Sequence, residues 1–98
     1  MFVTTQPEAL SIAAANLGTI GSAISSQNAA ASAPTTGILP AAGDEVSALV
    51  AAQFVAHAHL YQAVSSQAAA MHDLVVNALR TSADAYAATE AANAFATG

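Results

Sequence analysis

The segment from Asp44 to Arg80 carries apolar residues at alternating spacings of three and four, and these residues form two stripes rather than one. Such spacing is typical of a helix that packs against another helix. A single helical neighbour covers only one stripe, so the second stripe predicts a further partner. The first stripe comprises Phe54, His57, Tyr61, Val64, Ala68, Met71, Val75 and Ala78, and the second comprises Leu49, Ala52, Ala56, Leu60, Ala63 and Leu74.

A shorter helix is predicted over residues 7–32. The stretch Thr5-Gln6-Pro7-Glu8 is typical of a capping box, with Thr5 as the N-cap and Pro7 in the first turn. Glu8 would then reach back to the backbone N–H of Thr5. The apolar stripe of this helix comprises Leu10, Leu17, Ile20 and Ile24, and beside it lie the small residues Ala14, Gly18 and Ser22, which favour the close approach of another helix.

The predicted fold class is all-α, with residues 1–98 forming a single domain. Residues 33–43 hold two of the three prolines and two of the five glycines, so they are predicted to connect the helices. Asp44 and Glu45 favour the start of the longer helix, predicted over residues 44–80, and Arg80 favours its end. The two helices would form an antiparallel hairpin that completes a four-helix bundle with a partner protein. Residues 81–98 are predicted to be a tail in which the helical pattern weakens.

Composition excludes several classes of partner. Arg80 is the only Lys or Arg and the net charge is −5, so the chain cannot neutralise the phosphates of a nucleic acid. There is no cysteine, which excludes disulfides and Cys-ligated zinc. No cleavable signal peptide is predicted, because Pro7 and Glu8 interrupt the segment where an apolar core would run. No transmembrane span is predicted, because the uncharged residues 9–43 include many polar side chains and are otherwise mostly alanine.

The histidines are the obvious candidates for catalysis or metal binding, and their spacing argues against both. His57 and His59 point to different sides of a helix, and His72 lies roughly 22 Å further along the axis. No arrangement of nucleophile, base and orienting group can be assembled, so neither an enzyme nor a cofactor is predicted. His57 is expected in the apolar seam, whereas His59 and His72 are expected in solvent.

Taken in order, three features resemble the mycobacterial PE family. They are Pro7-Glu8 near the N-terminus, two alanine-rich helices without cysteine, and Tyr86-x-x-x-Glu90 after the predicted second helix. A serine often follows the initial methionine in that family, and this chain has Phe2 there. Spacing alone indicates only that Tyr86 and Glu90 share a helix face, if the tail is helical.

The resemblance implies a non-enzymatic binding module. PE proteins form heterodimers with PPE proteins, and the pairs are substrates of type VII (ESX) secretion. Tyr86 and Glu90 would form part of the export signal, close to a Trp-x-Gly turn of the partner. An EspG-type chaperone would hold the PPE partner in the cytoplasm, before the pair is secreted or reaches the cell envelope. The residues expected in the partner interface or the hairpin seam are Leu10, Leu17, Ile20, Ile24, Phe54, His57, Leu60, Tyr61, Val64, Met71 and Val75.

Two other functions stay open at this point. One is a PE/PPE complex of the cell envelope that transports small solutes, and the other is a self-associating ESX-type hairpin. A self-associating hairpin would carry its own Trp-x-Gly turn, whereas this chain has no tryptophan. The sequence also leaves open which apolar stripe faces the partner and which faces the other helix.

Overall fold

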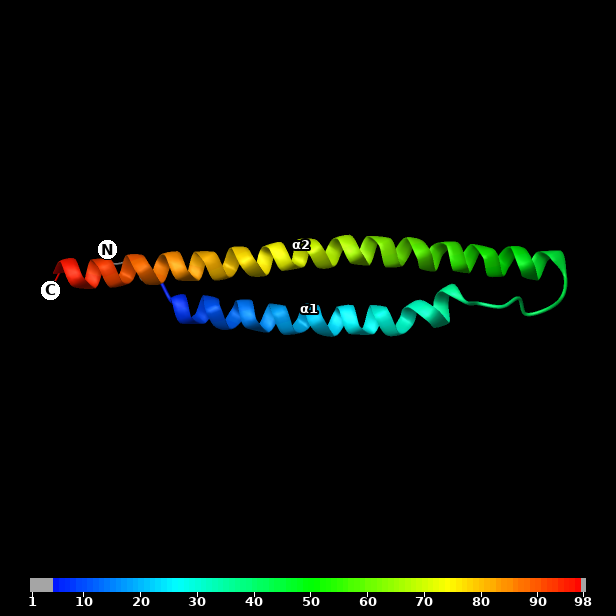
Figure 1. Ribbon diagram of the computed structural model, residues 1–98, viewed down its shortest axis with the longest axis horizontal. Coiled ribbons are helices and arrows are strands. Elements are labelled where there is room, and N and C mark those ends of the chain that lie inside the picture. Colours follow the sequence, from blue (N-terminus) through cyan, green and yellow to red (C-terminus); the bar gives the residue numbers. More distant parts are fainter. Residues whose placement is uncertain (1–4, 98) are drawn as a thin grey trace. The chain divides into compact units, whose positions relative to one another are not determined.

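The computed structural model describes residues 5–97, which form two α-helices and no strand (Figure 1). Helix α1 spans Pro7–Thr36 and helix α2 spans Glu45–Thr97. The two helices contribute to two compact units: unit 1 lies within Met1–Gly21 and Met71–Gly98, and unit 2 is Ser22–Ala70. Unit 2 is a helical hairpin, and unit 1 pairs the first half of α1 with the last part of α2. The all-α class and the two-helix hairpin are confirmed.

Helix α1 is longer than predicted, because it ends at Thr36 rather than near residue 32. Pro34 lies in its last turn, where a missing backbone N–H removes a single helical hydrogen bond. The N–H of Gly37 donates to the carbonyl of Ala33 at 3.0 Å and closes the helix. The connection is therefore residues 37–44, shorter than the predicted 33–43 at its first end.

Helix α2 continues to Thr97, so the prediction that it ends near Arg80 is wrong. Neither glycine nor proline interrupts residues 45–97, and alanine recurs throughout the last part. Thr, Ser and Asp lower helix propensity by less than about 0.7 kcal/mol each relative to alanine, which is too little to end a helix in such surroundings. The hydroxyl of Thr89 donates to the carbonyl of Ala85 within the helix at 2.9 Å. Tyr86 and Glu90 consequently lie one turn apart on the same face of α2.

The two helix starts differ from each other. In α1 the N–H of Leu10 donates to the carbonyl of Gln6 at 3.1 Å, so Gln6 rather than Thr5 is the N-cap, and Pro7 is the first helical residue. The predicted capping box is therefore wrong, because the register begins one residue later. In α2 the carboxylate of Asp44 accepts the N–H of Ser47 at 2.7 Å, as an N-cap does.

In each unit a regular seam of α2 faces α1, and it consists mostly of small and polar residues with Val55, Val76 and Leu79 among them. In unit 2 the buried and half-buried positions of α2 are Ser47, Ala51, Val55, Ala58, Gln62, Ser65 and Ala69, and in unit 1 they are His72, Val76, Leu79 and Ala83. Opposite them, α1 provides Ala14, which is 0% exposed, with Leu17 and Gly21 half-buried beside it. No large side chain among the described residues is fully buried.

The seam lies one residue beyond the first predicted stripe along its whole course. Val55 follows Phe54, Gln62 follows Tyr61, and the same offset recurs in unit 1. One residue turns the helix by about 100°, which carries the large apolar side chains away from α1. The physical reason is that the helices approach closely through small residues, and large ones would hold them apart. The residues of the first stripe therefore do not form the seam between the helices.

Two polar seam residues bind backbone carbonyls of α1. In unit 1 the Nε2 atom of His72 lies 2.6 Å from the carbonyl oxygen of Leu17, and in unit 2 the amide of Gln62 donates to the carbonyl of Asn28 at 3.0 Å. His72 is half-buried, so the expectation that it lies in solvent is wrong. A side chain of one helix reaches a backbone carbonyl of the other only where the residue beside that carbonyl has a small side chain or none. Gly21 provides that room, because a Cβ atom there would lie 2.7 Å from the His72 ring.

The two glycines in unit 1 provide a matched test of this packing. We expect Gly18→Ala to stabilise the helix pair by about 1 kcal/mol, because alanine favours helix. A Cβ atom at Gly18 would meet Arg80 at 3.7 Å, an ordinary contact. Gly21→Ala should be less stable than Gly18→Ala by about 1–3 kcal/mol, because the added methyl displaces His72 from Leu17. Thermal unfolding by circular dichroism measures both, and equal stabilisation by both substitutions would contradict the role of Gly21.

A second prediction concerns pH. The backbone N–H of Ser47, and after it the Ser47 hydroxyl, lowers the pKa of the Asp44 carboxyl below its ordinary value of 3.8. Ionised Asp44 therefore adds stability above pH 3.8, and that stability is lost as pH falls through the lower pKa of the folded state. We expect Asp44→Asn to retain the cap at neutral pH and to lose less stability on acidification than the unsubstituted chain. Asp44→Ala should lower the melting temperature already at neutral pH. Equal acid sensitivity of the Asn variant and the unsubstituted chain would contradict this.

Candidate interaction surface

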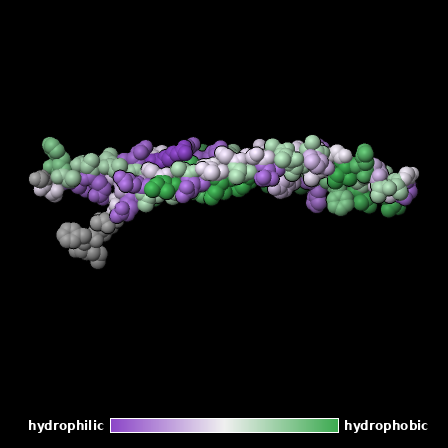
Figure 2. All heavy atoms as spheres, turned by 90° about the horizontal axis from the view of Figure 1, so that it is seen from below, coloured by the Kyte–Doolittle hydropathy of each residue, from purple (hydrophilic) through white to green (hydrophobic). Residues whose placement is uncertain are grey.

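Large apolar side chains lie at the surface of unit 2, outside the helix seam. Phe54 is 57% exposed, and Leu60, Tyr61 and Val64 are exposed to a similar degree. Figure 2 shows hydrophobic atoms gathered at the surface where unit 2 carries the connection between its helices. Contiguous apolar surface of this kind typically marks a binding site. Of the predicted residues in this unit, Ile24, Phe54, His57, Leu60, Tyr61 and Val64 are all exposed.

Two open hollows lie on unit 2, and Phe54 and His57 line both of them. One, of about 240 Å³, lies along α2 and is also lined by Leu49, Val50 and Gln53. The other, of about 500 Å³, is bounded by Phe54, His57, Ala58 and Tyr61 of α2, by Ala31 and Thr35 of α1, and by Ile38 of the connection. Because their walls are largely apolar, the hollows are suited to receiving apolar side chains of another protein. Ile38 lines the larger hollow, so this residue of the connection lies beside Phe54 and Tyr61 of α2.

Asn28 holds the helices of unit 2 in register. The hydroxyl of Tyr61 donates to its side-chain oxygen at 2.8 Å, and the amide of Gln62 donates to its backbone carbonyl. Two consecutive residues of α2 are thereby attached to one residue of α1. The Tyr61 ring consequently keeps a fixed position at the edge of the exposed surface while its hydroxyl is bonded.

Unit 1 also carries apolar side chains outside its seam. Met71 is 67% exposed, and Ile20, Leu74 and Val75 are more than half exposed. Leu10 and Leu17 are different, because both are half-buried in the pairing of α1 with α2. The predicted set therefore divides: Leu10 and Leu17 belong to the pairing within unit 1, while Ile20, Met71 and Val75 face outward.

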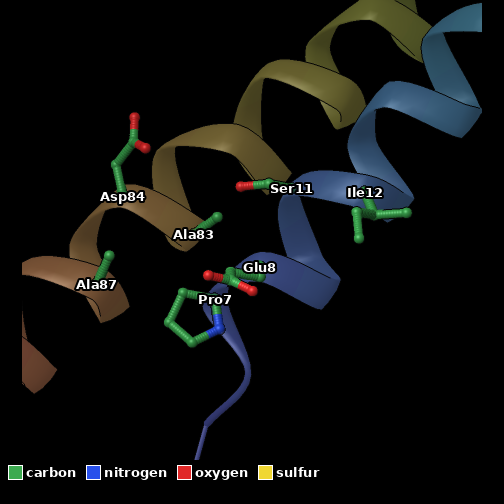
Figure 3. Close-up of a pocket in the computed structure, with 7 residues that line it drawn as sticks. All are labelled: Pro7, Glu8, Ser11, Ile12, Ala83, Asp84 and Ala87. Atoms are coloured by element: carbon green, nitrogen blue, oxygen red, sulfur yellow. The ribbon is translucent and has the colours of Figure 1, made fainter.

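The Pro7-Glu8 pair borders a hollow in unit 1 of about 400 Å³ (Figure 3). Its walls come from the first turns of α1 and from α2, and the Ser11 hydroxyl points toward α2 while the Asp84 carboxylate points away from α1. Ala83 is 1% exposed, because it is buried where α1 and α2 pack together at this hollow. The seven lining residues are Pro7, Glu8, Ser11, Ile12, Ala83, Asp84 and Ala87.

Tyr86 and Glu90 continue the register of the seam beyond Ala83. Steps of three and four lead from Ala83 to Tyr86 and then to Glu90. Tyr86 is 46% exposed and Glu90 is exposed, because α1 begins at Pro7 and does not extend beside them. The Thr5 hydroxyl, just before α1, donates to the Oε1 atom of Glu90 at 3.0 Å. Thr5 therefore contacts the far end of the chain instead of capping its own helix.

The described residues contain neither a metal-binding cluster nor an unpaired buried polar side chain. No group of three or more His, Cys, Asp or Glu side chains within residues 5–97 could hold a metal ion. No buried side-chain polar atom in that range lacks a hydrogen-bond partner.

By length and composition alone α1 would pass as a membrane span, a test that core helices of soluble proteins also pass.

Comparison with known proteins tests the resemblance to the PE family. The model of the PE family matches residues 3–93. The chain belongs to the PE family. It is 58% identical over 95 residues to the PE family protein PE13 of Mycobacterium tuberculosis, covering 97% of this chain and 96% of PE13. It is 59% identical over 95 residues to PE8 of the same organism, covering 97% of this chain and 34% of PE8.

Relatives within the PE family differ in how far they extend beyond the matched region. The PE-PGRS family protein PE_PGRS33 of M. tuberculosis is 56% identical over 93 residues, which are 95% of this chain and 20% of that protein. The chain thus spans about a third of PE8, a fifth of PE_PGRS33 and nearly all of PE13. What is common to these relatives and this chain is a stretch of 93–95 aligned residues.

Sequence reasoning did not find the contacts made by Asn28, His72 and Thr5. Each joins residues far apart in the chain, and each depends on which face of α2 meets α1. One signal was available: His72 and Gln62 lie ten residues apart, at positions immediately after members of the apolar stripe. Polar residues at regular spacing beside a run of small ones indicate a seam of close approach.

Proposed function

We propose that this PE domain is a non-enzymatic binding module that forms a heterodimer with a PPE protein. The observation that carries the proposal is that each unit has large apolar side chains outside its helix seam. Within the described residues these side chains remain uncovered: Phe54, Leu60, Tyr61 and Val64 in unit 2, and Met71, Leu74 and Val75 in unit 1. Two helices of a PPE protein that cover these side chains in each unit would complete a four-helix bundle.

The seam supports this proposal by exclusion. The seam residues already pair α1 with α2 in each unit, so the large apolar residues that remain exposed are not needed to hold the chain's own helices together. Burying one such side chain in an interface is worth roughly 1.5–3 kcal/mol, so several of them supply a strong driving force for association. The hollows beside Phe54 and His57 would receive side chains from the partner.

The export role rests on Tyr86 and Glu90. They lie one turn apart on a helical face that α1 leaves open, which makes them accessible to a recognition partner. In the proposed function they act as part of the type VII (ESX) export signal, close to a Trp-x-Gly turn of the PPE protein. An EspG-type chaperone would hold the PPE partner in the cytoplasm, and the exported pair would reach the cell envelope or the medium.

The experiment that tests heterodimer formation compares the chain alone with the chain co-expressed with each PPE protein of its own genome in turn. We expect circular dichroism to show loose helix with a broad thermal transition for the chain alone. One PPE protein should give a one-to-one complex by light scattering, with a sharp transition. A sharply melting monomer that binds none of them would contradict the proposal. A stable homodimer would favour the self-associating hairpin, and solute release from liposomes by the purified pair would favour the transport function.

Substituting the outward surface should separate binding from folding. We expect Val64→Glu or Met71→Glu to abolish the complex, because a carboxylate would be buried without a partner group. The helix content of the chain alone should not change, since neither residue lies in the seam. Ser66→Glu is the matched control, because it adds the same charge on another side of α2 and should leave the complex intact. Co-purification on a sizing column gives the result, and an intact complex with Val64→Glu would show that this surface does not bind the partner.

Substituting Tyr86 should separate export from binding. We expect Tyr86→Ala to stop secretion of the pair from a mycobacterium, while the complex still forms in the cell. Phe95→Ala is the control, because it removes an aromatic ring of the same helix that is more exposed than Tyr86. Immunoblots of culture medium and cell lysate measure the two fractions. Normal secretion of Tyr86→Ala would remove Tyr86 from the export signal.

A further inference from the structure

We infer that Thr5 is a positioning residue for Glu90, and that it holds the carboxylate of the export signal in the orientation in which it is recognised. The inference rests on the proposed role of Tyr86 and Glu90 in export. It deepens that role by adding a residue from the opposite end of the chain. The observation that carries it is the hydrogen bond from the Thr5 hydroxyl to Oε1 of Glu90, at 3.0 Å across 85 positions of sequence.

Thr5 is placed for this contact by the start of α1. Gln6 is the N-cap and Pro7 is the first helical residue, so Thr5 lies just outside the helix, and its hydroxyl is not committed to capping. Proline at the first helical position fixes the backbone there and restricts the residue before it to extended conformations. The direction in which Thr5 leaves α1 is therefore restricted by the Pro7 ring and the helical register that follows it.

Glu90 gains from such a contact, because α1 does not extend beside it. Glu90 follows Ala83 and Tyr86 in the register of the seam, but α1 begins only at Pro7 and leaves the last turns of α2 exposed. A glutamate side chain on an exposed helix samples many rotamers, and ordering it on recognition costs conformational entropy. Thr5 removes that freedom in advance, which is the general benefit of preorganisation.

The contact also leaves the carboxylate able to act. A hydrogen bond to an ionised carboxylate is stronger than one between neutral groups, so a single hydroxyl suffices to hold it. A carboxylate offers two acceptor oxygens, and Thr5 bonds to Oε1, so Oε2 can accept a donor from the recognition partner. Tyr86 lies one turn away on the same face, and its position relative to the held carboxylate is then fixed by the helix.

The test is secretion of the full chain with its PPE partner from a mycobacterium, with four variants compared in parallel. We expect Thr5→Val to lower the secreted fraction about fivefold, the change in population that loss of one hydrogen bond produces. Thr5→Ser should restore secretion, because it restores the hydroxyl. Thr19→Val is the matched control: it makes the same substitution at an exposed residue of α1 whose hydroxyl bonds only to Ala15 of the same helix. Tyr86→Ala reports on the export signal itself.

A structural role alone would give a different result. If Thr5 merely stabilised the fold, Thr5→Val would lower the melting temperature of the purified pair and the yield of the complex in the lysate. Positioning leaves both unchanged while secretion falls. Normal secretion of Thr5→Val, with Tyr86→Ala blocked, would overturn the inference and leave the proposed function standing. Normal secretion of Tyr86→Ala would overturn the proposed function instead.

Discussion

Close approach between α1 and α2 is the constraint on which the rest of the structure depends. Small residues along both helices let the side chains of Gln62 and His72 reach backbone carbonyls of α1, and Gly21 is the position where an added methyl would obstruct that contact. Because the close approach leaves little room between the helices, most of the large apolar side chains lie on the outside. The residues of the seam and the exposed apolar surface thus both follow from the close approach of α1 and α2.

The class of fold and the existence of both helices could be predicted from sequence, because helix-forming composition and the turn residues at 33–43 are local signals. The ends of the helices could not be predicted. They depend on the hydrogen bonds made by the Gln6 carbonyl and the Gly37 N–H, and on the small effect of Thr and Ser on the helix propensity of α2. Those contributions are small and are summed over many residues.

The sequence also predicted the wrong face of α2 toward α1, and this larger error has a physical origin. The spacing pattern assigns Phe54 and Met71 to the seam because they are large and apolar. In the structure, the residues that follow them, Val55 and His72, face α1 instead. The rule that apolar residues lie inside holds for a complete domain, and this PE domain exposes them at its surface. The Thr5–Glu90 contact was also beyond prediction, because it depends on where α1 begins and on α2 continuing past Arg80.

Residues of the seam and residues of the outer surface are constrained by different contacts, so they accept different substitutions. Seam positions accept few substitutions, because enlarging a residue such as Ala14 or Ala83 forces the helices apart. Outer positions such as Phe54 and Val64 can exchange one apolar shape for another without altering how α1 meets α2. A change of binding preference therefore requires no new fold, and duplicated copies of such a chain could diverge in partner choice while retaining an identical helical framework.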